Sequence, residues 1–177
     1  MRKVKVDLPE LVSAYQMGSD EIAHFLDFET GEVVMVFQDA SRAAEEFLEE
    51  VDMDNCEDPK ARLEQWLTEC DHCDWDADCV WDALLVETRF GERFIRVPAQ
   101  ESRDGYRDMA DFAEAIGDKH LQDLFFVALN GKGAFRRFKD VLGDYPDERE
   151  QWFKFSEEKV KARVLQWLES EEIEVVQ

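Results

Sequence analysis

Apolar residues recur at helical spacing along most of this chain, and they follow a strand pattern only in short runs. Residues 8–15 place their apolar side chains on one face of a helix, so a first helix is predicted there. The runs 22–28 and 33–37 are rich in aromatic and β-branched residues and flank a turn that contains Gly31. This combination predicts an antiparallel hairpin.

Two acidic amphipathic helices are predicted in the middle of the chain. One begins near Asp39, and the other opens at Asp58-Pro59, where an N-cap residue precedes a proline suited to the first turn. Their apolar stripes consist of Ala43, Ala44, Phe47, Leu48 and Val51, and of Leu63, Trp66, Leu67 and Cys70.

The stretch that leads to Pro98 is open to two interpretations. Residues 83–90 and 93–97 fit a second pair of strands around Gly91, and Pro98 would end the second strand. Residues 79–86 fit a helix equally well, so both alternatives stand.

The last third has a helical pattern, with Gly117 and Gly131 as helix ends. Its three apolar stripes are Tyr106, Met109, Phe112, Ala113 and Ile116; Leu121, Leu124, Phe125, Ala128 and Leu129; and Phe135, Phe138, Val141 and Leu142. A final helix is expected after Ser156 as its N-cap. The pattern predicts a single α+β domain, 1–177, in which an N-terminal helix and antiparallel hairpin strands pack with a mainly helical C-terminal half. An acidic helical insertion is expected at about 43–92.

Charge changes this picture, because the chain carries a formal net charge of -22. Residues 39–87 hold 17 Asp or Glu and 3 Lys or Arg, which gives this stretch a net charge of -14. Such acidity disfavours direct binding to duplex nucleic acid and to anionic lipid, because Lys and Arg carry most of that binding. A basic protein partner is expected instead, and the alternative is that the charge serves solubility alone.

The chain contains no apolar run long enough to span a membrane, and residues 2–7 lack the apolar stretch of a signal peptide. Four cysteines are few for a secreted scaffold of 177 residues. A cytoplasmic location without membrane association is therefore expected.

The cysteines are candidate metal ligands. Cys70 and Cys73 have the two-residue separation of a zinc knuckle. Cys56 and Cys79 would complete a tetrahedral set, or His72 would replace one of them. Inert thiols and a redox-active pair are the alternatives. We expect no other cofactor.

The segment GKGAFRRFKD is a candidate anion site. A helix after Gly133 would point backbone N–H groups at a phosphate or carboxylate, and Lys132, Arg136, Arg137 and Lys139 would add positive charge. The spacing matches neither common phosphate-binding loop. The alternative is a capped helix whose cations pair with carboxylates elsewhere in the chain.

Trp75 lies among carboxylates and is a candidate anchor for a basic partner. Asp71, Asp74, Asp76 and Asp78 surround it in the sequence. An exposed indole ringed by carboxylates would bind Arg or Lys through cation–π contact and charge.

Six stretches carry a resemblance to a known family. They are FLDFETGEVV (25–34), RFIRVP (93–98), GYRDMADFAEAI (105–116), GKGAFRRFKDVL (131–142), REQWFKF (149–155) and VLQWLESEEIE (164–174). In this order they resemble the bacterial Uncharacterised Protein Family 0158, whose members are small acidic proteins without an established activity. The stretch at about 43–92 departs from the pattern of that family.

The sequence favours a non-enzymatic binding protein, because neither His24 nor His120 has a Ser, Cys or Asp at a recognisable motif spacing. We expect an adaptor or inhibitor that engages a basic protein through its acidic middle segment. In the most specific version of this hypothesis, that segment mimics the charge of DNA. The alternative is a module that binds a small anion, a nucleotide or an RNA end through GKGAFRRFKD. Homo-oligomerisation stays open.

Overall fold

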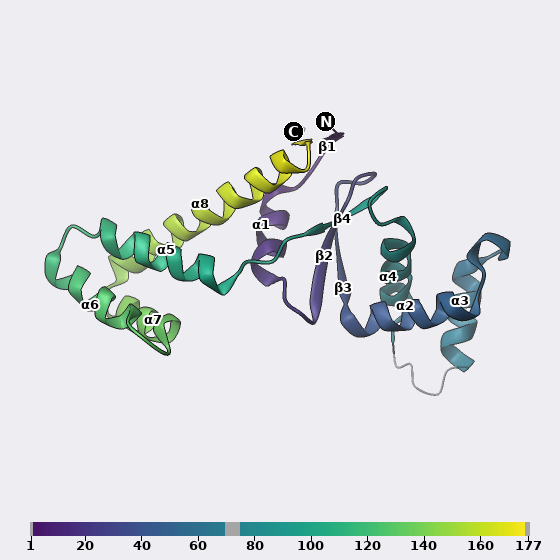
Figure 1. Ribbon diagram of the computed structural model, residues 1–177, viewed down its shortest axis with the longest axis horizontal. Coiled ribbons are helices and arrows are strands. Elements are labelled where there is room, and N and C mark those ends of the chain that lie inside the picture. The colour runs from purple at the N-terminus through teal and green to yellow at the C-terminus, as the bar shows by residue number, and fades with distance from the viewer. Residues whose placement is uncertain (1, 70–74, 176–177) are drawn as a thin grey trace. The chain divides into compact units, whose positions relative to one another are not determined.

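The computed structural model describes residues 2–69 and 75–175, and it confirms the α+β class (Figure 1). The chain divides into two compact units. Unit 1 comprises Met1–Ala99 with Glu171–Gln177, and unit 2 comprises Gln100–Ser170. The expectation of a single domain stays a prediction, because compactness alone does not decide whether a unit folds independently.

The antiparallel sheet of unit 1 is built on the predicted hairpin. β2 (Ile22–Asp27) pairs with β3 (Val33–Phe37) along one edge and with β4 (Phe94–Val97) along the other, so the strand order is β3-β2-β4. Gly31 in the hairpin turn has a φ of 79°, and a Cβ atom there would lie 1.8 Å from the carbonyl oxygen of Lys5. Glycine is therefore required at this turn.

The acidic helices of unit 1 share a core with the sheet. The helices of this unit are α1 (Leu8–Met17), α2 (Gln38–Glu50), α3 (Pro59–Glu69) and α4 (Ala77–Arg89), with a short 3₁₀ turn at Met53–Asn55. Phe47, Leu63 and Leu84 are fully buried in one cluster with Val36 of β3 and Phe94 of β4. The stretch expected as an acidic insertion is thus anchored by the same apolar contacts that bury the sheet.

Helix α4 settles the two interpretations of the stretch before β4. Val80, Ala83 and Leu84 are buried at helical spacing, so the strand expected at 83–90 is wrong and the helical alternative is confirmed. The strand expected at 93–97 is present as β4.

A second sheet was not predicted. β1 (Arg2–Val4) and β5 (Ile173–Val175) pair in parallel, with Arg2 opposite Ile173. Strands of three residues are too short to give a clear alternating pattern, and their pairing joins residues far apart in the sequence.

Unit 2 is a set of helices around an aromatic core. The helices are α5 (Ser102–Ala115), α6 (Lys119–Leu129), α7 (Ala134–Asp144) and α8 (Pro146–Ser170). Phe112, Phe125 and Phe138 are buried, and the ring centroids of Phe125 and Phe138 lie 4.9 Å apart. No helix in the described ranges is both long and apolar enough to cross a membrane.

Three expectations for unit 2 are wrong. Tyr106, from the first of the three apolar stripes, is 43% exposed. Phe135 is 42% exposed, because the buried face of α7 runs through Ala134, Phe138 and Leu142. Ser156 is not an N-cap, since α8 already begins at the helix-opening Pro146. The Ser156 hydroxyl instead donates to the carbonyl of Phe153, 3.3 Å away inside the helix.

Candidate functional site

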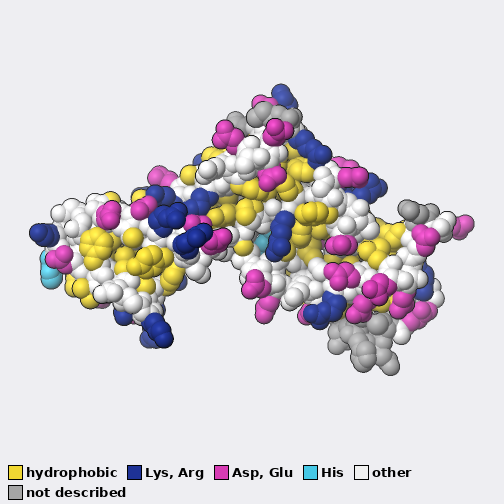
Figure 2. Space-filling model, in the orientation of Figure 1, with side chains coloured by type: hydrophobic (Ala, Val, Ile, Leu, Met, Phe, Trp, Pro, Cys, Tyr) yellow, Lys and Arg dark blue, Asp and Glu magenta, His cyan; other side chains and the backbone are white. Residues whose placement is uncertain are grey.

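The acidic helices of unit 1 expose carboxylates that exceed their own cations. Residues 39–87 contain three cations, and each is already paired: Arg42 with Asp39 at 3.5 Å, Lys60 with Asp78 at 2.8 Å, and Arg62 with Glu69 at 3.5 Å. In the part of the chain that the structure describes, no ion pair involves Glu45, Glu46, Glu49, Glu57 or Glu64, and all five are exposed. Figure 2 shows Asp and Glu side chains gathered over the part of unit 1 that holds α2. The surface therefore has unbalanced negative charge.

Burial and neighbouring carboxylates shift the pKa values of two groups on α3 and α4. Partial desolvation raises the pKa of Asp82 above its ordinary value, and the negative charge of Asp78 raises it further. Asp78 also raises the pKa of the Lys60 ammonium group, first through their hydrogen bond and then through its charge. The part of each shift that comes from the charge of Asp78 reflects a negative local potential, which favours bound cations.

A cavity of about 390 Å³ opens beside Trp75 in unit 1. Its walls are formed by Glu21, Ile22, Phe37, Gln38, Asp39 and Trp75. Trp75 is half-buried, and its ring centroid lies 6.4 Å from that of Phe37. Two carboxylate residues and two aromatic rings thus line one hollow, and such a combination suits a guanidinium or ammonium group.

The aspartates predicted to surround Trp75 have separate roles where they can be described. Asp76 caps α4, because its side chain accepts a hydrogen bond from the N–H of Asp78 at 2.9 Å. Asp78 pairs with Lys60. Asp71 and Asp74 lie outside the described residues. The carboxylates that line the Trp75 cavity are instead Glu21 and Asp39, which sequence proximity did not indicate.

The cysteine set is only partly described. Cys70 and Cys73 lie outside the described residues, and Cys56 and Cys79 are free, partly buried thiols. Burial raises the pKa of Cys79, and the charges of Asp76, Asp82 and Asp78 raise it further, which disfavours the thiolate. Among the described residues, no group of three or more His, Cys, Asp or Glu side chains has a metal-binding arrangement.

The GKGAFRRFKD segment forms the start of α7, with Gly133 at the N-cap in a left-handed conformation, φ 80°. Arg137 is engaged within unit 2: its Nε donates to the carbonyl of Ala128 at 3.0 Å and its Nη2 to the carbonyl of Asn130 at 2.5 Å. It therefore caps the C-terminal end of α6. The side chains of Lys132, Arg136 and Lys139 are exposed and make no ion pair within the described ranges.

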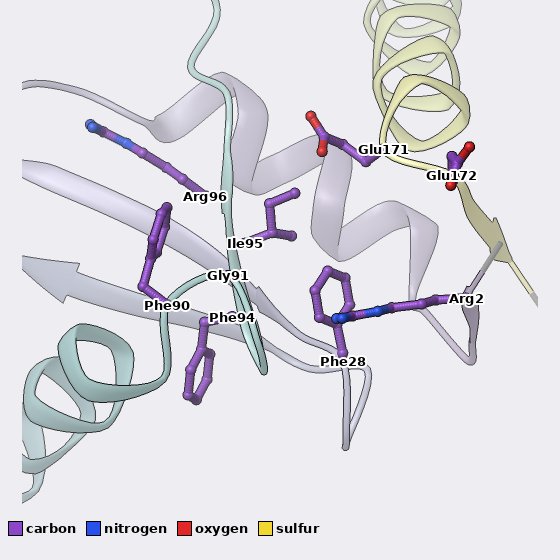
Figure 3. Close-up of a pocket in the computed structure, with 9 residues that line it drawn as sticks. All are labelled: Arg2, Phe28, Phe90, Gly91, Phe94, Ile95, Arg96, Glu171 and Glu172. Atoms are coloured by element: carbon purple, nitrogen blue, oxygen red, sulfur yellow. The ribbon is translucent and has the colours of Figure 1, made fainter.

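A larger cavity, of about 610 Å³, lies beside β4 in unit 1 and was not predicted. Its lining residues are Arg2, Phe28, Phe90, Gly91, Phe94, Ile95, Arg96, Glu171 and Glu172 (Figure 3). The guanidinium carbon of Arg2 lies 4.6 Å from the centre of the Phe28 ring, and its Nη1 donates to the carbonyl of Glu92 at 2.8 Å. No local motif could have indicated this cavity, because its residues come from four separate stretches of the chain.

Two comparisons with known proteins bear on this chain. The model of the family described as Uncharacterised protein family (UPF0158) matches residues 68–177, so the second half of the stretch at 43–92 falls within the pattern of that family. A protein of Pseudomonas aeruginosa described as a UPF0158 protein is 23% identical over 174 residues, which cover 98% of this chain and 88% of the relative. No solved structure matches the chain significantly.

The family match includes the last two residues of α3, the whole of α4 and β4, and all helices of unit 2. It therefore covers the GKGAFRRFKD segment and the strand that lines the larger cavity. Since it extends over more than half of the chain, this chain belongs to the uncharacterised protein family UPF0158.

Proposed function

We propose that this protein is a non-enzymatic adaptor or inhibitor that binds a basic protein through the acidic helices of unit 1. The observation that carries the proposal is the Trp75 cavity, in which Trp75 and Phe37 line the same hollow as Glu21 and Asp39. One Arg or Lys side chain of the partner occupies this cavity as an anchor.

The surrounding charge supports this assignment. The exposed carboxylates of α2 and α3 attract a basic surface and speed its association, while the anchor in the cavity fixes one binding position. A partner that normally contacts nucleic acid has a suitable surface, and the protein would then inhibit it by imitating phosphate charge.

The alternative, an anion-binding module at GKGAFRRFKD, has less support. The guanidinium of Arg137 is committed to the carbonyls at the end of α6, which leaves Lys132, Arg136 and Lys139 as the cations available to an anion.

Capture of partners from a nuclease-treated lysate of the native host tests the proposal. The immobilised baits are the wild-type protein, a Trp75→Leu/Asp39→Asn variant that keeps apolar packing against Phe37, and an Arg136→Ala control. We expect a basic protein on the wild type and the control, and we expect it to be lost from the double variant. With the purified partner, the double variant should weaken binding by about 10- to 30-fold, as for an interface hot spot of about 2 kcal/mol.

Retention of the same proteins by the wild type and the double variant would contradict the assignment of the Trp75 cavity. Capture that depends on nucleic acid, and is reduced in Arg136→Ala, would instead favour the GKGAFRRFKD alternative.

A further inference from the structure

Strand β4 has an outer edge that points away from its partner strand. In the order β3-β2-β4 it pairs with β2 along one edge, with Leu26 opposite Ile95 and His24 opposite Val97. The carbonyl of Phe94 instead accepts a hydrogen bond from the N–H of Gly91, at 2.9 Å, outside this ladder. Main-chain groups alternate between the two edges of a strand, so those of Arg96 share the outer edge with those of Phe94.

The edge is open at Arg96. Phe90 and Gly91 cover it at Phe94, and within the described residues no backbone hydrogen bond outside the β2–β4 ladder uses the N–H or carbonyl of Arg96. The larger cavity runs beside this position, lined by Phe94, Ile95 and Arg96 in succession. Figure 3 shows Phe90 and Arg96 at one end of it, with Arg2 and Phe28 at the other.

Two side chains at this edge are available for recognition. Phe90 is 57% exposed, although its ring packs edge-on against Phe25 at 6.3 Å. Arg96 is exposed and makes no ion pair within the described part of the chain, even though the unit is rich in carboxylates. A carboxylate placed directly opposite Arg96 on an added strand would neutralise it at cross-strand distance.

We propose that the outer edge of β4 binds an extended segment of a partner polypeptide as an additional strand. The segment places an Asp or Glu side chain opposite Arg96 and an apolar side chain against Phe90, and its main chain pairs with the free N–H and carbonyl of Arg96. This surface is separate from the Trp75 cavity, and the proposal does not depend on the basic partner suggested above.

A second copy of this chain fits the edge poorly. Because Phe94 is already covered by Gly91, antiparallel pairing of two β4 edges about a twofold axis would centre on Arg96. The two guanidinium groups would then lie directly opposite each other, and like charges in this arrangement are destabilising.

Selection from a random library of 12-residue peptides displayed on phage tests the proposal, with the full-length protein as bait. We expect enriched peptides to combine Asp or Glu with apolar residues. We expect Arg96→Pro to weaken their binding about tenfold or more, because it removes the outward N–H while the ladder to β2 keeps its hydrogen bonds. Arg96→Ala, which keeps the N–H, should lose the preference for Asp and Glu and weaken binding less.

N-methylation of the peptide main chain tests the same contact with the wild-type protein, and it applies even if Arg96→Pro does not fold. N-methylation at successive positions of an enriched peptide should weaken binding at the residue whose N–H donates to the carbonyl of Arg96, and it should have little effect at the two flanking residues, because main-chain donors alternate between the two edges of a strand. Failure to enrich any peptide, equal binding to wild type and Arg96→Pro, or uniform effects of N-methylation would overturn the proposal. So would a wild-type dimer that becomes a monomer in Arg96→Pro, because the edge would then bind a second copy.

Discussion

Asp27 is a carboxylate that the sheet of unit 1 buries to 3% exposure. Nε and Nη2 of Arg93 donate to its oxygens over 2.7–3.1 Å, and the N–H of Glu29 donates to it at 2.8 Å. Burial by itself would raise the pKa of Asp27, but the hydrogen bonds and the charge of Arg93 outweigh it. The pKa of Asp27 therefore lies below its ordinary value of 3.8.

The sign of the resulting pH dependence follows from this shift. Since the pKa in the folded state is lower than in the unfolded state, ionised Asp27 stabilises the protein above pH 3.8, and this contribution is lost as the pH falls further. We expect the free energy of unfolding to fall more steeply below about pH 4 in the wild type than in Asp27→Asn. At pH 7, Asp27→Asn should be less stable by about 2 kcal/mol, because Arg93 loses charged hydrogen bonds.

Urea unfolding at several pH values measures both effects. Glu29→Gln is the matched control, because Glu29 also pairs with Arg93, at 3.1 Å, but has a largely exposed side chain. It should change stability by less than about 0.5 kcal/mol. Equal acid sensitivity of the wild type and Asp27→Asn would show that Asp27 does not supply the effect.

Helix α7 shows how an element can resemble a binding site and serve its own unit. Its apolar face buries Ala134, Phe138 and Leu142, while Arg137 extends to the carbonyls of Ala128 and Asn130 at the end of α6. The left-handed Gly133 lets the chain enter α7 directly after that end. One cation of GKGAFRRFKD thus stabilises the connection between two helices.

We expect Arg137→Ala to lower the free energy of unfolding by about 1–2 kcal/mol, because two carbonyls lose a charged donor. Arg136→Ala, one residue away and without an ion pair in the described part of the chain, should change it by less than about 0.5 kcal/mol. Chemical denaturation of both variants measures the difference. Equal stability of the two would indicate that the Arg137 contacts contribute little in solution.

The molecule as a whole carries far more negative than positive charge, and the excess is concentrated at residues 39–87. Their three cations are consumed by ion pairs within the same stretch, so the remaining carboxylates repel one another. Apolar contacts of α2, α3 and α4 hold these helices in unit 1 against that repulsion.

Salt should therefore stabilise the protein. We expect its melting temperature to rise when NaCl increases from about 0.05 M to about 0.5 M, because screening weakens repulsion among exposed carboxylates. A Glu45→Gln/Glu46→Gln/Glu49→Gln variant should show a smaller rise. Differential scanning calorimetry measures both, and a melting temperature that falls with salt would contradict net repulsion as the dominant surface effect.

Local capping and periodicity were readable in the sequence because they depend on neighbouring residues. Asp58 accepts a hydrogen bond from the N–H of Ala61 at 3.1 Å, as its position before Pro59 indicated. The expected start of α8, after Ser156, lies too late in the chain. Serine is a common N-cap residue, but Ser156 lies inside a continuous helix that begins at Pro146. Burial of Phe135 was wrongly expected because a small residue, Ala134, occupies the buried position beside it.

The amino-acid pattern is enough to predict the α+β class, the hairpin, most helical segments and the concentration of negative charge, since each of these depends on composition or on spacing within one segment. The fold was needed to show which distant residues meet. It placed Glu21 and Asp39 at the Trp75 cavity, and it left the outer edge of β4 open at Arg96. Such contacts depend on how the elements pack, and hydrophobic spacing specifies which face of an element is buried without specifying its neighbour.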